Sequence, residues 1–204
     1  MAEETAAAAA KRAEFEAGTA ADPGNAKLWA RFVTFELKDG GGGILAGRAV
    51  CERALAALSD SAIENFVYWS WSLAERRAGD VDGQRRVLER WVRRLPRGGG
   101  GFGKQGWNEY LAFEVRDGGV ERVRAVGEGL LAAFPMDPTA YLLYVRALAA
   151  LSLHVEAFAV AERGVKELSG WCRGHDERIW RFMAKYIRSL ETKQSTAWDD
   201  SNFW

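Results

Sequence analysis

The stretch NFVYWSWSLAERRAGDVDGQRRVLERWVRRLP, residues 65–96, contains one complete unit of a pattern that recurs along the chain. Its first half places an aromatic residue at Tyr68, a second aromatic at Trp71 and an acid at Glu75. Its second half, from Val87 onward, has apolar residues at the i, i+1, i+4 and i+5 spacing of one helix face. The stretch therefore predicts two helices joined by a short turn.

The first half of this unit recurs along the chain, each time beginning at an aromatic residue. Successive starts are separated by 39, 39, 34 and 39 residues, a period that is typical of helical solenoids. The residues in the three slots are Trp29, Phe32 and Glu36; Tyr68, Trp71 and Glu75; Trp107, Tyr110 and Glu114; Tyr141, Tyr144 and Leu148; and Trp180, Met183 and Ile187.

The second half recurs as well, with an arginine four residues before a glutamate in most units. Because insertions such as Gly40 to Gly43 fall between the halves, each half behaves as a separate helix. We expect the first-helix glutamates and the second-helix arginines to pair and to fix how one repeat docks on another. The second-half signature residues are Arg48 and Glu52; Arg85, Glu89, Arg90, Trp91 and Pro96; Arg124, Glu128 and Pro135; and Glu162 with Arg163.

Aromatic-x2-aromatic-x3-Glu, followed by Arg-x3-Glu-Arg and then Pro, resembles the HAT (half-a-TPR) repeat of RNA-processing scaffolds. A closer resemblance is to the N-terminal repeats of the crooked-neck family of splicing factors. It is good over residues 25–135 and weaker beyond, and its most specific part is Glu89-Arg90-Trp91 followed by Trp107 and Phe113-Glu114. The resemblance implies a nuclear, non-enzymatic scaffold that binds other splicing-complex proteins.

The predicted fold is all-α, with antiparallel HAT/TPR-like helix pairs stacked into a right-handed α-solenoid. Residues 1–24 form an N-terminal segment with a partial capping helix near 5–17, and residues 192–204 form a tail. Residues 25–191 contain about four and a half repeats, which start near 26, 62, 104, 138 and 176. Their helices are expected over 26–38, 44–58, 62–78, 81–95, 104–116, 120–134, 138–151, 154–168 and 176–191.

The composition argues against several other classes of protein. The chain has 28 basic and 28 acidic residues, so no global charge draws it to nucleic acid or to a membrane. The alanine-rich N-terminus lacks the basic and apolar regions of a signal peptide, and no apolar stretch is long enough to span a bilayer. Cysteines are few and far apart, which fits a reducing compartment, and Cys172 with His175 offers only two ligands for zinc. We therefore predict no enzyme activity, cofactor, metal, small-molecule substrate or membrane partner.

Gly98 to Lys104 formally matches the phosphate-binding motif G-x4-G-K. That motif requires a preceding strand and a following Ser or Thr, whereas here an arginine-rich helix is expected before it and Gln105 comes next. A flexible loop between repeats is the favoured interpretation.

An arginine-rich helix face is the candidate contact site for RNA or an acidic partner. Arg86, Arg90, Arg93 and Arg97 follow helical spacing, with Arg94 alongside. The favoured alternative is a solvated face paired with glutamates of the adjacent helix, such as Glu75 and Glu114. Trp91 occupies a core slot and is not expected to stack on bases.

Further alternatives remain open at the level of sequence. Trp198, Phe203 and Trp204 in the polar tail are equally consistent with a docking segment and with a cut chain end. A direct RNA-binding domain and a scaffold for polyadenylation or pre-rRNA processing are the competing functions, and a homodimer is compatible with the resemblance. The unit length and the tryptophan-plus-glutamate signature disfavour an ordinary TPR co-chaperone.

Overall fold

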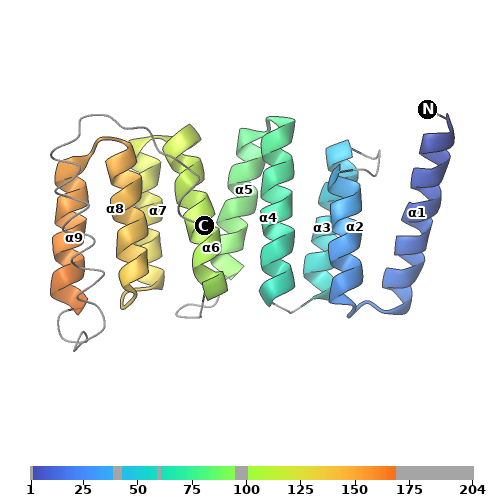
Figure 1. Cartoon of the computed structure of the whole chain (residues 1–204), viewed down its shortest axis with the longest axis horizontal. Helices are drawn as coiled ribbons and strands as arrows, with labels where there is room; N and C mark the ends of the chain where they lie inside the picture. Colours follow the sequence, from blue (N-terminus) through green and yellow to red (C-terminus); the bar gives the residue numbers. More distant parts are fainter. Residues whose placement is uncertain (1, 39–42, 59–60, 95–100, 169–204) are drawn as a thin grey trace. The chain divides into compact units, whose positions relative to one another are not determined.

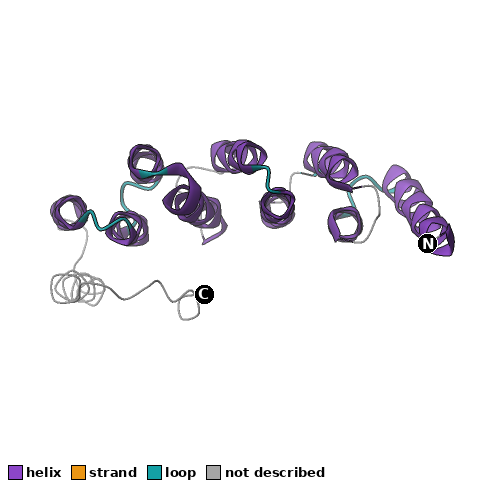
Figure 2. Cartoon of the chain, turned by 90° about the horizontal axis from the view of Figure 1, so that it is seen from above, coloured by secondary structure: helices purple, strands orange, loops and turns teal. Residues whose placement is uncertain are grey.

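The computed structural model describes residues 2–38, 43–58, 61–94 and 101–168 (Figure 1). Within these ranges every regular element is a helix, and no strand occurs among them (Figure 2). The prediction of an all-α fold is thus confirmed for the described part of the chain. The elements are α1 (Ala2–Ala21), α2 (Ala26–Lys38), α3 (Gly43–Ala57), α4 (Ser61–Ala78), α5 (Val81–Arg94), α6 (Gly101–Phe113), the π-helix η1 (Glu114–Gly118), α7 (Val120–Ala133), α8 (Pro138–Ala150) and α9 (His154–Leu168).

The chain divides into two compact units, Met1–Gly106 and Trp107–Trp204. Unit 1 holds α1 to α5 and the first part of α6, and unit 2 holds the rest of α6, η1 and α7 to α9. Within each unit the helices pack on one another, mostly on their neighbours in the sequence.

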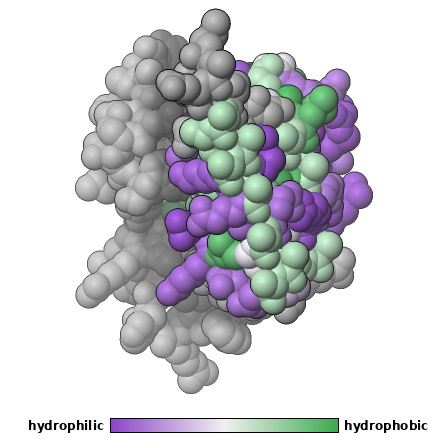
Figure 3. All heavy atoms as spheres, turned by 90° about the vertical axis from the view of Figure 1, so that its right-hand side faces the viewer, coloured by the Kyte–Doolittle hydropathy of each residue, from purple (hydrophilic) through white to green (hydrophobic). Residues whose placement is uncertain are grey.

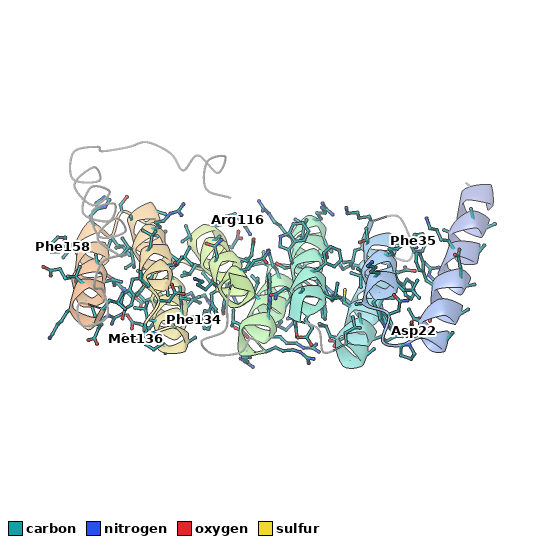
Figure 4. The ribbon with its side chains drawn as sticks, turned by 60° about the horizontal axis from the view of Figure 1, so that its bottom comes forward. Asp22, Phe35, Arg116, Phe134, Met136 and Phe158 are labelled. Atoms are coloured by element: carbon teal, nitrogen blue, oxygen red, sulfur yellow. The ribbon has the colours of Figure 1, made fainter. Side chains whose placement is uncertain are left out.

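In unit 1, α2 packs on α1, α3 and α4, while α4 packs on α3 and α5. The aromatic slots supply the core between α1 and α2: Phe15 stacks on Phe32 with ring centroids 5.2 Å apart, and Phe35 also contacts Phe15. Figure 4 shows Phe35 directed from α2 toward α1. The opposite face of α1 mixes hydrophilic and weakly apolar residues (Figure 3). Residues 1–24 thus contribute a helix that covers the apolar side of α2.

In unit 2, α7 packs on η1 and α8, and α8 packs on α9. Asp137 caps α8 by accepting a hydrogen bond from the Thr139 backbone N–H at 2.9 Å, and Pro138 occupies the first turn, as the Asp-Pro pair predicts. Gly127 lets α7 and α8 approach closely, because a Cβ there would lie 2.2 Å from the ring of Tyr144.

Two expected helices, 26–38 and 154–168, have their predicted limits, and α3, α4, α5, α7 and α8 agree with the prediction to within one residue at each end. The N-terminal helix is longer than predicted, since it covers Ala2–Ala21. The helix expected over 104–116 begins at Gly101 and gives way to the π-helix after Phe113. The helix expected over 176–191, with Trp180, and the tail residues Trp198, Phe203 and Trp204 lie outside the described residues.

Candidate interaction surfaces

Two first-helix glutamates of unit 1 are buried and bound by an arginine of the preceding second helix. Arg12 of α1 donates to both carboxylate oxygens of Glu36, at 2.5 and 2.9 Å. Arg48 of α3 donates to both oxygens of Glu75, at 2.7 and 2.6 Å, and the Trp71 indole N–H adds a third bond at 2.7 Å. These bonds compensate the desolvation of the carboxylates and link consecutive helix pairs.

Glu114, the third glutamate in this slot, is buried at the start of η1. The π-turn brings its carboxylate over Gly118, where a Cβ would lie only 1.4 Å from Oε2. A side chain at position 118 would therefore require the Glu114 carboxylate to move from this position.

In α8 of unit 2 the glutamate slot is Leu148, and the acid comes from another helix. Arg124, the counterpart of Arg48, donates to Glu156 of α9 at 2.8 and 2.6 Å. Glu156 occupies the slot of Gly83, where a Cβ would lie 2.8 Å from Glu75 Oε2. A carboxylate thus lies near the arginine in both cases. For Arg48 it belongs to the first helix of a pair, and for Arg124 it belongs to the second.

A second series of ion pairs joins successive second helices inside each unit. Here an arginine reaches the glutamate of the preceding second helix, and the pairs are Arg53 with Glu16, Arg90 with Glu52, and Arg163 with Glu128. In α7 the arginine slot is Gly129, where a Cβ would lie 3.0 Å from the Trp107 ring. All these pairs are partly exposed, so each contributes less to stability than the buried Arg48–Glu75 pair.

The aromatic slots form the core and not a binding platform. Trp91 is buried, stacks on Tyr68 at 6.0 Å and donates its indole N–H to Asn65 at 2.7 Å. Trp29 and Tyr141 each donate to the carbonyl of a proline six residues earlier. None of these rings is available for stacking on a base.

The predicted signature residues therefore differ in their exposure. Buried are Trp29, Phe32, Glu36, Tyr68, Trp71, Glu75, Trp91, Tyr110, Glu114, Tyr141 and Tyr144. Partly buried are Arg48, Arg85, Glu89, Trp107 and Arg124, and exposed are Glu52, Arg90, Glu128 and Pro135. Pro96 and Trp180, together with Arg97 of the arginine-rich face, lie outside the described ranges.

The arginine-rich face of α5 separates into a bound part and an open part. Arg90 binds Glu52, and Arg94 binds Glu64 at 2.6 Å, so both are engaged with earlier helices. The side chains of Arg86 and Arg93 are 68% and 79% exposed. Arg86 lies 3.9 Å from Asp80, and Arg93 lies 3.6 Å from Glu89. Pairing with acids is thus present, but Glu75, one of the expected partners, is bound by Arg48 and Trp71 instead.

One exposed aromatic residue, Trp69, was not singled out by the repeat pattern. It lies on α4 beside the Tyr68 slot, and 40% of its surface is accessible. Phe66 and Leu73, three residues before and four after, are half-buried on the same side of the helix, and Arg76 follows in the last turn. We call Phe66, Trp69, Leu73 and Arg76 the Trp69 face. Its signal in the sequence is an aromatic outside the repeat slots, where the other first helices have Ala30, Asn108 and Leu142.

The described residues contain no cluster of His, Cys, Asp and Glu that could hold a metal ion. Cys51 is buried, and burial raises the pKa of its thiol, which makes it unreactive; Cys172 and His175 lie outside the described residues. In the part of the chain that is described, no helix is both long and apolar enough to cross a bilayer.

The phosphate-loop pattern also lacks its structural context. Gly103 and Lys104 lie inside the first turns of α6, and α5 is the described element before them. A phosphate loop requires a strand at that position and a loop around the glycines.

Neither a protein-family model nor a curated protein matches this chain.

Proposed function

We propose that the chain is a non-enzymatic scaffold for pre-mRNA splicing, built from HAT-like helix pairs stacked as a right-handed α-solenoid, and that it acts in the nucleus. It would bind other splicing-complex proteins by surface complementarity. The observation that carries this proposal is the buried arginine–glutamate pair between consecutive helix pairs, present as Arg12–Glu36 and Arg48–Glu75. The same slots carry the resemblance of residues 65–114 to crooked-neck repeats.

The Trp69 face is the proposed anchor for a protein partner. Large aromatic side chains with an apolar surround contribute most of the affinity in many interfaces. A partner would fit this face with an apolar pocket for Trp69 and an acidic residue near Arg76, since α4 offers both features within three turns.

Affinity purification from nuclear extract tests the proposal. We expect the wild-type chain to recover splicing-complex proteins, and Trp69→Ala to recover several-fold less. Leu45→Ala is the matched control, because Leu45 is an exposed apolar residue of α3 outside the Trp69 face. Recovery of polyadenylation or pre-rRNA factors without splicing factors would contradict the splicing assignment and leave the scaffold class intact.

Direct RNA binding is the second candidate, and the exposure of Arg86 and Arg93 favours it. The double variant Arg86→Glu/Arg93→Glu isolates these two side chains, because Arg90 and Arg94 stay in their ion pairs. If each arginine contacts one phosphate, the slope of log affinity against log salt should fall by about 0.7 per phosphate lost. Arg122→Glu, an exposed arginine of α7, is the control. An unchanged slope, or no binding by the wild type at low salt, would exclude this surface.

A further inference from the structure

A cavity of about 300 Å³ opens at one end of unit 1, where α2 ends, α3 begins and α4 ends (Figure 1). Leu37, Ile44 and Ala74, one residue from each of these helices, give it apolar walls. Ala74 is buried, and Leu37 and Ile44 are half-buried. The volume is at the small end of the range of about 300–1,000 Å³ for ligand sites, so a single side chain of a partner fits it better than a cofactor does.

Two cationic residues, Lys38 and Arg77, line the opening of this cavity. Both are exposed, in contrast to the apolar walls. In the described part of the chain, neither side chain forms an ion pair. Arg53 of the same unit, by contrast, binds Glu16. The two cations at the opening are therefore available to an anionic group of another molecule.

The repeat places a cation at this position in three of the four first helices that are described. The position lies nine residues after the aromatic start and is occupied by Lys38 in α2, Arg77 in α4, Arg116 in η1 and Ala150 in α8. Arg116 binds Asp117 at 2.6 Å, unlike Lys38 and Arg77. A cation in the last turn stabilises a helix through its dipole, which explains the recurring charge but not an apolar cavity beside two of them.

Glu36 also lines the cavity, and its charge is already balanced. Its carboxylate is buried and accepts two hydrogen bonds from Arg12, at 2.5 and 2.9 Å. An anion deep in the cavity would be repelled by Glu36, whereas an anion at the opening would be attracted by Lys38 and Arg77. The arrangement thus fits an apolar side chain inside the cavity and carboxylates outside it.

A protein partner matches these features better than a nucleic acid does. Single-stranded nucleic acids bind where cations alternate with aromatic rings on which the bases stack. None of the residues that line the cavity is aromatic. Its apolar walls instead match an aliphatic side chain, which a protein segment carries and a nucleic acid does not.

We propose that the cavity binds an acidic segment of a partner protein. An apolar side chain of that segment would lie against Leu37, Ile44 and Ala74, and neighbouring carboxylates would pair with Lys38 and Arg77. The site is separate from the Trp69 face, and the inference does not depend on the proposed splicing function, since it concerns only the chemistry of this end of unit 1.

Fluorescence polarisation of the full chain with a labelled peptide, Glu-Glu-Leu-Glu-Glu, tests this. We expect saturable binding that weakens as salt is raised, because exposed ion pairs are screened. A peptide with glycine in place of leucine, and one with glutamines in place of the glutamates, should each bind several-fold more weakly. The first cannot fill the apolar cavity, and the second cannot pair with the cations.

Charge reversal identifies the residues. Lys38→Glu/Arg77→Glu should weaken binding of the acidic peptide by about tenfold or more, since two attractive pairs become repulsive. The same variant should gain affinity for Lys-Lys-Leu-Lys-Lys, a result that an unfolded variant would not give. Lys27→Glu/Arg122→Glu is the matched control, because it makes the same change of charge at two exposed cations that do not line the cavity. Trp69→Ala should bind the peptide as the wild type does, which separates this site from the Trp69 face.

Four results would overturn the proposal. These are no saturable binding by the wild type at low salt, equal affinity for the glutamate and glutamine peptides, and a loss of affinity in the control variant as large as in Lys38→Glu/Arg77→Glu. The fourth is tighter binding of an oligouridine than of the peptide, lost in the same variant, which would assign the two cations to RNA.

Discussion

Arg124 of α7 and Glu156 of α9 form the same two-bond ion pair, at 2.8 and 2.6 Å, that Arg48 and Glu75 form between α3 and α4. Arg48 and Arg124 occupy the same position of the repeat, whereas Glu75 and Glu156 occupy different positions. Since Leu148 has replaced the glutamate of α8, the carboxylate comes from the neighbouring second helix. Arg124 thus has an acidic partner, as Arg48 does, although that partner comes from a different helix of the repeat.

The Arg48–Glu75 pair should be strongly coupled. Arg48→Ala leaves the buried Glu75 carboxylate with the Trp71 indole and should cost about 3 kcal/mol of unfolding free energy. The double variant Arg48→Met/Glu75→Gln should lose less stability than Arg48→Ala, because no charge is then buried and the amide oxygen at position 75 still accepts the Trp71 indole N–H. Urea unfolding followed by circular dichroism measures both. Arg53→Ala, which breaks an exposed pair, is the control and should cost less than about 1 kcal/mol. If the double variant were as unstable as Arg48→Ala, lost packing and not the unpaired Glu75 carboxylate would explain the loss of unfolding free energy.

Stability should depend on pH through Glu16. The hydrogen bonds from Arg53 hold the pKa of Glu16 below its usual value. The folded pKa is therefore lower than the unfolded one, so the stabilisation is complete above about pH 4.3 and is lost as pH falls through the folded pKa. Glu16→Gln should be less stable than the wild type at pH 7, and the difference should vanish near pH 2. Glu14→Gln, in the same helix, controls for removal of a negative charge. If Glu16→Gln lowered the unfolding free energy equally at pH 7 and pH 2, the ion pair with Arg53 would not be the cause.

Gly127→Ala should destabilise unit 2 even though alanine is the better helix former. A Cβ at position 127 would overlap the Tyr144 ring, and such overpacking costs about 1–3 kcal/mol. Ala125→Gly, at an exposed position of the same helix, isolates the propensity term and should cost about 1 kcal/mol. Thermal unfolding of the two variants shows whether each substitution raises or lowers the melting temperature. If Gly127→Ala raises the melting temperature, α7 and α8 do not approach each other as closely as the structure has them.

The Trp91–Asn65 hydrogen bond should orient the tryptophan inside unit 1. Asn65→Ala removes the acceptor of a buried indole N–H and should cost about 1–3 kcal/mol. In Trp91→Phe/Asn65→Ala the unpaired donor is absent, so the added cost of Asn65→Ala in that background should be much smaller. A double-mutant cycle in urea measures this coupling. Equal costs of Asn65→Ala in both backgrounds would show that Asn65 acts through its other contacts.

The helices could be predicted from the sequence because each half of the repeat carries its own apolar period and its own turn signals. Asp137-Pro138 marks the start of α8 to the residue, since both the cap and the ring of proline act locally. The limits around Phe113 could not be predicted, because no capping or turn residue in the sequence marks the change from α-helix to π-helix at Glu114.

The ion pairs were predictable by type and only partly by partner. Arginine and glutamate recur at fixed slots, so their pairing followed from the repeat. That Glu75 would be taken by Arg48, leaving the α5 arginines to Glu52 and Glu64, depends on which helix faces which. Glu156 was missed for the same reason: it lies at the position equivalent to Gly83, where the repeat pattern has no acid, and gains its role only from its distance to Arg124.

The position of the acid in unit 2 also distinguishes the helix contacts of α7 from those of α3. Chains of similar repeats can mispair, because one helix resembles the docking partner of several others. If α8 docked where α4 belongs, Arg48 would meet Leu148, lose the buried Glu75 and keep only the partly exposed Asp80 as an acidic partner. If α4 docked where α8 belongs, the carboxylates of Glu75 and Glu156 would both face Arg124. In either exchange a charged side chain would lose its proper partner. The positions of the carboxylates therefore favour the native order of the helices.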